Sequence, residues 1–188
     1  MKPLSQKECF QLIHSMRMMD HIIDHSIMVG NVSLCLGTHL KKRFPNINTD
    51  LLVSAALLHD ITKTRSFETG ELHSHTGATL LDQMGYPQVG NIIRQHVLMD
   101  AGWEKQPISE IHIVNYADKR VLHDKVVPLD KRFEYIRERY GKGKKFQNKI
   151  QKMCDATCQL EKNLFANLPF KADALFEHTR PVIQKQRP

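Results

Sequence analysis

One segment constrains the fold of this 188-residue chain more than any other: a near-continuous apolar run that ends in a histidine and an aspartate. The run from Leu51 to Leu58 predicts a helix that is buried on most sides and therefore central. His59 and Asp60 follow it directly, and Lys63 comes three residues later. A buried imidazole and carboxylate are costly to desolvate unless a charged partner binds them, and a divalent metal is the commonest such partner. A solvated or capped helix end is the alternative, so the pair alone does not decide.

The rest of the chain has the pattern of helices. Ser5 and Glu8 have the spacing of a capping box, which predicts a first helix from Ser5 to about Met18. No stretch shows sustained alternation between hairpin turns, so we predict an all-α, single-domain helical bundle. The further helices are expected at 20–43, 51–58 (capped by Thr49 or Asp50), 74–84 (or from 76), 88–99, 109–122, 128–140 and 144–164, with a loop at 64–72.

Composition and charge exclude some classes of protein. The hydrophobic fraction is 41%, and no apolar run approaches the roughly 20 residues that span a bilayer. The N-terminus lacks the apolar core of a signal peptide, so we expect a cytoplasmic protein without a membrane partner. The four cysteines lack the spacing of a metal knuckle, and we expect no role for them.

The net charge of +7 is concentrated between Lys119 and Lys152. One interpretation is a solvated turn and helix face. The other is a positive rim that attracts a phosphorylated substrate. A nucleic-acid binder that uses residues 142–152 ranks last, because the segment lacks the interleaved aromatic residues that would stack on bases.

Further histidines and an aspartate interrupt apolar segments on successive predicted helices. His25, His73 and His96 each have an ordinary explanation, because a histidine on an apolar face is most often a hydrogen-bonded core residue. Asp118 is harder to explain, since aspartate is a poor helix former and is rarely buried without a partner. Together with the pair that ends the apolar run, these positions indicate one shared site.

The order His25, His59-Asp60, Asp118 resembles the HD-domain superfamily of metal-dependent phosphohydrolases. The surrounding residues match as well: Ser26 and Val29 follow His25, the segment 55–63 reads Ala-Ala-Leu-Leu-His-Asp-Ile-Thr-Lys, and 116–119 reads Tyr-Ala-Asp-Lys. The similarity covers roughly residues 20–140. It implies an all-helical bundle in which those four residues hold a metal.

His73 and His96 resemble the two histidines that some branches add to bind a second metal. The resemblance then implies that Asp60 bridges two ions, with Asp60, His73 and His96 on the second. His75 is the alternative to His73, but no glycine lies four residues after it, whereas Gly77 follows His73. Such a mixed nitrogen and oxygen set suits Fe, Mn, Co, Ni or Zn without choosing among them.

The nearest branch is the small six-ligand one that includes bacterial diadenosine-tetraphosphate hydrolases, although the residues after His96 depart from its form. The resemblance implies a metal-activated water that hydrolyses a phosphomonoester, phosphodiester or phosphoanhydride bond of a small nucleotide-like substrate. Asp60 and Lys63 are the expected catalytic residues. Lys63, and more weakly Arg94 and Lys119, are the candidates to contact the phosphate; alternatively, Lys63 only complements a helix C-terminus.

Two further expectations concern the function and the organisation of the chain. The rival function is a metal-binding regulatory or ligand-sensing module without turnover, and a homodimer is allowed for. The expected organisation is an N-terminal helix (1–18) packed on the core, the metal-binding HD helical domain (19–141), a C-terminal helical extension of that domain (142–184) and a disordered tail (185–188).

Overall fold

The centre of the structure is α3 (Thr49–Leu58), the helix predicted from the apolar run. The computed structural model describes residues 2–186, and within it every residue from Leu52 to Leu58 is buried. The side chain of Asn48 caps the helix by accepting hydrogen bonds from the backbone N–H groups of Asp50 and Leu51. Asn48 therefore takes the capping role that we expected of Thr49 or Asp50.

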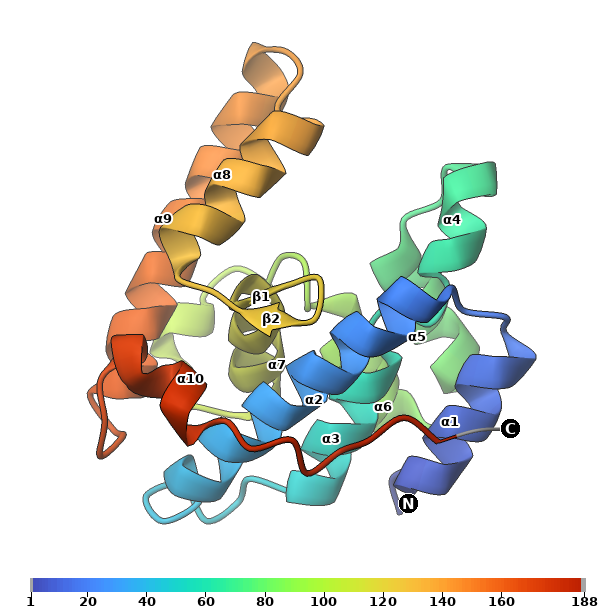
Figure 1. The fold of residues 1–188 in the computed structure, drawn as a ribbon, viewed down its shortest axis with the longest axis horizontal. Coiled ribbons are helices and arrows are strands. Elements are labelled where there is room, and N and C mark those ends of the chain that lie inside the picture. Colours follow the sequence, from blue (N-terminus) through green and yellow to red (C-terminus); the bar gives the residue numbers. More distant parts are fainter. Residues whose placement is uncertain (1, 187–188) are drawn as a thin grey trace.

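The fold of residues 2–186 is all-α, as predicted, with one antiparallel pair of two-residue strands (Figure 1). The capping box of Ser5 and Glu8 is present at the start of α1. None of the helices within residues 2–186 has both the length and the apolar character needed to cross a bilayer. The other elements are α1 (Gln6–Ser15), α2 (Asp20–Leu40), α4 (Lys63–Thr69), α5 (His73–Gln83), α6 (Pro87–Arg94), η1 (Trp103–Lys105), α7 (Glu110–Lys119), β1 (Val121–Leu122), β2 (Lys125–Val126), α8 (Leu129–Tyr140), α9 (Lys144–Phe165), η2 (Ala172–Ala174) and α10 (Leu175–His178).

The structure differs from the expected helices at several boundaries. The helix expected over 109–122 ends at Lys119, and Val121–Leu122 form strand β1 instead. The segment 64–72, predicted as a loop, contains α4, because Gly70 is not the middle of a loop but the left-handed residue that ends this helix. The helix expected over 88–99 stops at Arg94. Asn115 of α7 donates hydrogen bonds to the carbonyls of Gln95 (2.8 Å) and His96 (3.0 Å). These carbonyls therefore bind a side chain of α7 in place of the backbone N–H groups that would continue the helix.

The C-terminal segment returns along α2 to the first helix (Figure 1). Asn31 of α2 accepts from the backbone N–H of Ile183 (2.7 Å) and donates to its carbonyl (3.1 Å), in the manner of a strand partner. Lys185 pairs with Asp20 and Asp24. The disorder expected after Gln184 therefore does not apply at Lys185, while residues 187 and 188 lie outside the described residues.

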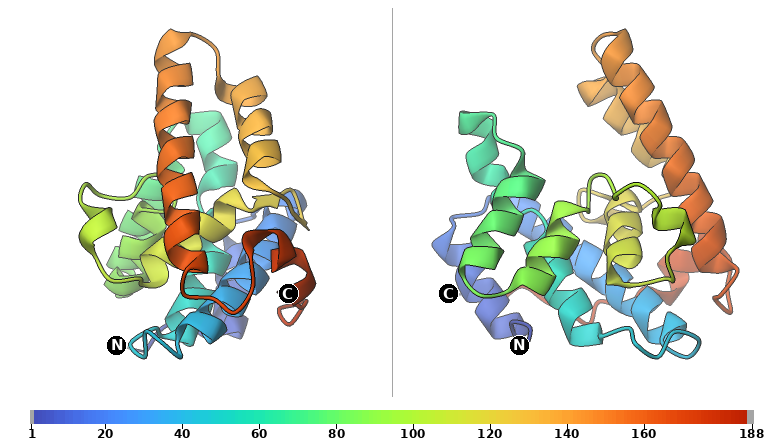
Figure 2. Two further views of the ribbon diagram at one scale, coloured as in Figure 1. Left: turned by 90° about the vertical axis from the view of Figure 1, so that its left-hand side faces the viewer. Right: turned by 180° about the vertical axis from the view of Figure 1, so that it is seen from behind.

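Helices α8 and α9 form a hairpin, here called the arm, that projects from the body on the same side as α4 (Figures 1 and 2). Its base is anchored by a buried arginine, Arg120. The guanidinium pairs with Glu161 of α9 at 3.1 Å and donates to the carbonyls of Val127 and Ala172. Because these partners come from three separate segments, the network fixes where the arm leaves the body.

The contact between α5 and α6 predicts a packing effect. A Cβ at Gly90 of α6 would lie 2.8 Å from the backbone oxygen of Ala78 of α5, which cannot move away as a side-chain tip can. We expect Gly90→Ala to lower the free energy of unfolding by about 1–3 kcal/mol. Gln88→Ala, on the exposed face of the same helix, should stay within about 0.5 kcal/mol of wild type. Urea denaturation followed by circular dichroism measures both, and equal stability of the two variants would contradict the packing argument.

Candidate metal centre

His59 and Asp60 lie at the end of α3, inside the body of the protein. Their exposed fractions are 0% and 1%. The Nδ1 of His59 bonds to the carbonyl of Ala56 (2.8 Å), one turn back in the same helix. Its Nε2 then lies 3.4 Å from Asp60 Oδ2 and 3.7 Å from Asp118 Oδ1. The last turn of the helix thus turns the imidazole toward both carboxylates.

The same arrangement recurs at two other histidines. His25 of α2 bonds through Nδ1 to the carbonyl of His123 (2.9 Å) and places Nε2 at 3.1 Å from Asp118 Oδ1. His96 bonds through Nδ1 to the carbonyl of Ile93 (2.7 Å). A carbonyl can only accept, so Nδ1 carries a proton, and in the neutral imidazole the lone pair is then on Nε2. This is the orientation of metal-ligating histidines, whose second nitrogen is held by a backbone or carboxylate oxygen.

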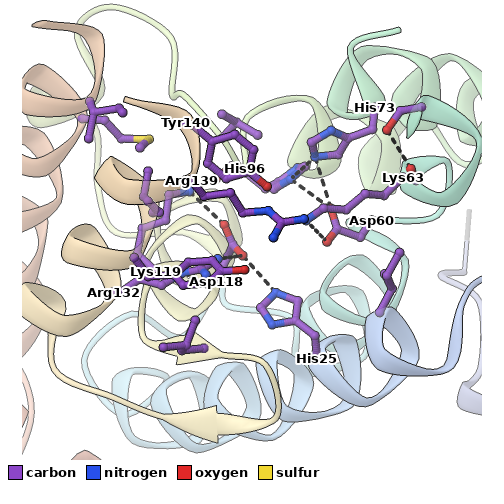
Figure 3. Close-up of a pocket in the computed structure, with 18 of the residues that line it drawn as sticks. His25, Asp60, Lys63, His73, His96, Asp118, Lys119, Arg132, Arg139 and Tyr140 are labelled. Carbon is purple, nitrogen blue, oxygen red and sulfur yellow. Dashed lines mark hydrogen bonds and ion pairs between the residues drawn. The ribbon is translucent and has the colours of Figure 1, made fainter. Parts of the chain in front are cut away.

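His73, the first residue of α5, completes the group. Its Nε2 lies 3.1 Å from Asp60 Oδ1 and 3.2 Å from the Nε2 of His96. His75 is exposed at the surface of the same helix. The structure therefore brings together His25, His59, Asp60, His73, His96 and Asp118, here called the cluster (Figure 3).

Neighbouring charges keep the two carboxylates ionised. Burial acts to raise the pKa of Asp60, but Lys63 and His59 outweigh it and hold this pKa well below its usual range. For Asp118 burial is likewise outweighed, first by Lys119 and then by His25. Burial lowers the pKa of His96 to about 4 despite the opposing effect of Asp60. Ionised carboxylates and a neutral imidazole are the protonation states that metal binding requires.

Among the described residues, two polar atoms of the cluster have no hydrogen-bond partner and are therefore available to bind a metal ion. Within residues 2–186, His59 Nε2 and Asp60 Oδ1 are buried and have no hydrogen-bond partner. Each such atom costs about 1–3 kcal/mol when left unpaired. Three ligand atoms lie within 4.8 Å of one another in each of two sets: His25, His59 and Asp118, and His59, Asp60 and His96. The donors and their unmet bonding capacity fit a divalent transition metal.

The three basic residues expected at the phosphate have different positions. Lys63 begins α4, donates to Asp60 Oδ2 at 2.7 Å and lines the cavity above the cluster. From the start of α4, its ammonium group thus faces the cluster. Lys119 is 2% exposed and donates to Asp118 Oδ2 (3.0 Å) and to the carbonyl of His96, so it holds ligands in place.

Arg94, which we expected to be a weaker candidate for contacting the phosphate, lies outside the site. Its guanidinium forms two hydrogen bonds with Asp100, at 2.7 and 2.6 Å, and the described lining of the cavity does not include it. The helix expected over 88–99 would carry Arg94 in its interior. The helix instead ends at Arg94, and the chain folds back so that Asp100 meets the guanidinium outside the site.

Sequence reasoning missed Arg132 of α8. Its Nη2 lies 3.7 Å from Asp118 Oδ1, and its Nε is buried without a hydrogen-bond partner in the described part of the chain. The side chain is 13% exposed and enters a cavity of about 530 Å³ that opens over the cluster. Figure 3 shows Arg132 on the opposite side of this cavity from Lys63. Several arginines of α8 alternate with other charged residues, and no local pattern distinguishes Arg132 from them.

Metal binding should be visible as a gain in stability. We expect Mn²⁺ or Co²⁺ to raise the melting temperature of the metal-free protein, with about 2.7 kcal/mol of stabilisation at a concentration 100 times the dissociation constant. Asp60→Ala should abolish the shift, because this carboxylate lies between His59 and His73. Asp82→Ala, at an exposed acid of α5, is the control and should keep it. An undiminished shift in Asp60→Ala, measured by differential scanning fluorimetry, would refute the site.

The two neighbouring histidines of α5 give a second, sharper comparison. His73→Ala should reduce the bound metal per chain, because its Nε2 is within 3.1 Å of Asp60. His75→Ala should leave the metal content unchanged, because that side chain is exposed. Elemental analysis after loading and desalting checks both, and the reverse order of the two variants would overturn the assignment.

Comparison with known proteins gives one match. The family model of the HD domain matches residues 22–121, which is more than half of the chain and extends from α2 to β1. No curated protein and no solved structure matches the chain.

Proposed function

The chain belongs to the HD domain family, and from this premise we propose that it is a metal-dependent phosphohydrolase that acts on a small nucleotide-like substrate. The observation that carries the proposal is the buried cluster at the floor of a cavity with cationic side chains on two sides. Such a floor attracts metal ions, and the cations beside it attract an anionic substrate. Family membership supports hydrolysis of phosphorylated compounds; the nucleotide and the particular bond are our inference.

Each cluster residue has a role in this proposal. His25, His59, Asp60 and Asp118 would hold one ion, and Asp60, His73 and His96 a second. Bound there, divalent ions would lower the pKa of a water and withdraw charge from phosphoryl oxygens. The backbone carbonyls behind three of the imidazoles fix the rings, so the ligand atoms are oriented before an ion arrives.

Two cations flank the carboxylates from opposite walls. Lys63 bonds to Asp60 from the α4 side, and Arg132 approaches Asp118 from α8. A phosphate above the cluster would lie between them. Guanidinium groups form paired hydrogen bonds with phosphate oxygens, and the buried Nε of Arg132 has this capacity unused within the described residues. We therefore assign Lys63 and Arg132 to substrate orientation, and Lys119 to holding Asp118.

Phosphate release tests the proposal. Metal-loaded protein, assayed with nucleoside mono- and polyphosphates, dinucleoside polyphosphates and cyclic nucleotides, should release phosphate or the nucleotide product from at least one. Asp60→Ala and Asp118→Ala should each lower kcat/KM by at least about 100-fold, since each removes a metal ligand. Arg94→Ala should stay within about twofold of wild type, because its partner Asp100 lies outside the cavity.

Two results would contradict the enzyme assignment. Activity that survives both aspartate variants would place the reaction elsewhere. Stoichiometric metal binding without turnover of any compound would favour the regulatory or ligand-sensing module instead.

A further inference from the structure

The cavity over the cluster has two chemically different parts. Its floor is the cluster, with Lys63 and Arg132 beside it. The wall formed by the arm is apolar and aromatic along much of its length. The arm residues of this kind that line the cavity are Tyr135, Ile136, Tyr140, Phe146, Ile150 and Met153, here called the arm wall. A phosphate and metal ions need only the floor.

The exposed aromatic rings of this wall point to a ligand. Phe146 is 56% exposed and Tyr140 51%, although both border the cavity. Phe67, 53% exposed, also lines the cavity and belongs to α4, which Figure 1 shows across from the arm. Covering a large aromatic side chain with another apolar surface removes it from water, which lowers the free energy. Rings on both sides of one opening therefore favour a ligand whose own apolar part lies between them.

Cations alternate with the rings on the arm. The guanidinium of Arg132 lies 5.9 Å from the ring centre of Tyr135, and that of Arg139 lies 5.9 Å from the ring centre of Tyr140. Figure 3 shows Arg132, Arg139 and Tyr140 entering from the α8 side, opposite Lys63 and His73. A planar group that stacks on a ring and an anion that pairs with an arginine can thus be bound within one cavity.

The arm wall lies outside the part of the chain that defines its family. The HD domain match ends at residue 121, whereas the arm begins at Leu129. The cluster therefore lies within the family match, and the arm wall lies beyond it. Changes in the arm wall can therefore alter which substrate binds while the metal-binding residues stay the same.

We propose that the arm wall is a subsite for an aromatic or heteroaromatic ring of a phosphorylated ligand whose anionic group lies at the cluster. The placement of the anion rests on the proposed function. Ligand cavities of about 300–1,000 Å³ enclose most of a drug-sized molecule, and this one, at about 530 Å³, holds a phosphate with one ring system. A phosphorylated open-chain polyol would leave the rings of the wall uncovered and should bind more weakly.

The experiment compares two phosphonates that differ only in the organic group. Phenylphosphonate and methylphosphonate carry the same anion, and their C–P bond resists hydrolysis. Titration calorimetry on Mn²⁺-loaded protein should show phenylphosphonate binding about tenfold tighter or more, because its ring buries apolar area against the wall. The double variant Phe146→Ala, Tyr140→Ala should reduce this preference to below about threefold and leave the methylphosphonate affinity unchanged.

Both substituted positions are more than half exposed, so the double variant should fold, which circular dichroism verifies. Phe176→Ala is the matched control: this ring is 70% exposed on α10 and lies outside the cavity lining, and the preference should persist. Equal affinity of wild type for the two phosphonates would overturn the subsite. A preference that survives the double variant, or no binding of either compound, would overturn it as well.

The outcome is separable from that of the proposed function. Binding with the expected preference but without hydrolysis of any substrate would support the subsite and refute the enzyme. Hydrolysis of a substrate without a preference for phenylphosphonate would support the enzyme and refute the subsite.

Discussion

A buried carboxylate at the end of the central helix α3 is the constraint on which the rest of this structure depends. Asp60 is 1% exposed, and its ionised form is retained only because compensating groups reach it. Lys63 comes from the start of α4, His73 from the start of α5, and His96 from the turn after α6. Ends of helices, rather than their middles, therefore meet at this point, and the helix boundaries are as important to the site as the residues themselves.

Much of the fold and of the candidate site could be predicted because both leave local signals. The uninterrupted apolar run predicted α3, and absence of strand-like alternation predicted the all-α fold. The six cluster residues were found because polar side chains interrupt apolar helical segments, and because their order resembles that of the HD-domain superfamily, which also favoured His73 over His75. Two misplaced helix ends have different causes. Gly70 ends α4 from within the segment, whereas Asn115 helps to end α6 through contacts 19 and 20 residues away in sequence, which no local pattern contains.

The arm shows a second limit of sequence reasoning. Helix α8 is rich in charge, and which of its arginines faces the cavity depends on the direction in which the arm leaves the body. That direction is set at the base by Arg120, which connects α7 with Glu161 of α9 and with the carbonyl of Ala172. Arg132 thus obtains its position near Asp118 from residues that follow it by about 30 or 40 places in the chain. The role of Arg132 could therefore not be predicted from the sequence without the tertiary structure.

The carbonyls behind the imidazoles have a consequence for how such a site can change over time. His25, His59 and His96 are held by main-chain oxygens of His123, Ala56 and Ile93. Every residue type carries a main-chain oxygen, so the identities of these three positions can drift without loss of the contact, provided that the backbone path is kept. At His123 that path is left-handed, with φ of 56°, which restricts the replacements to residues that tolerate it, such as asparagine, aspartate or glycine. Ala56 and Ile93 are fully buried, so packing limits them to side chains that fit the core, whereas His123 is exposed and is limited by its backbone conformation. The three positions are thus constrained for different reasons, although none contributes a ligand atom to the cluster.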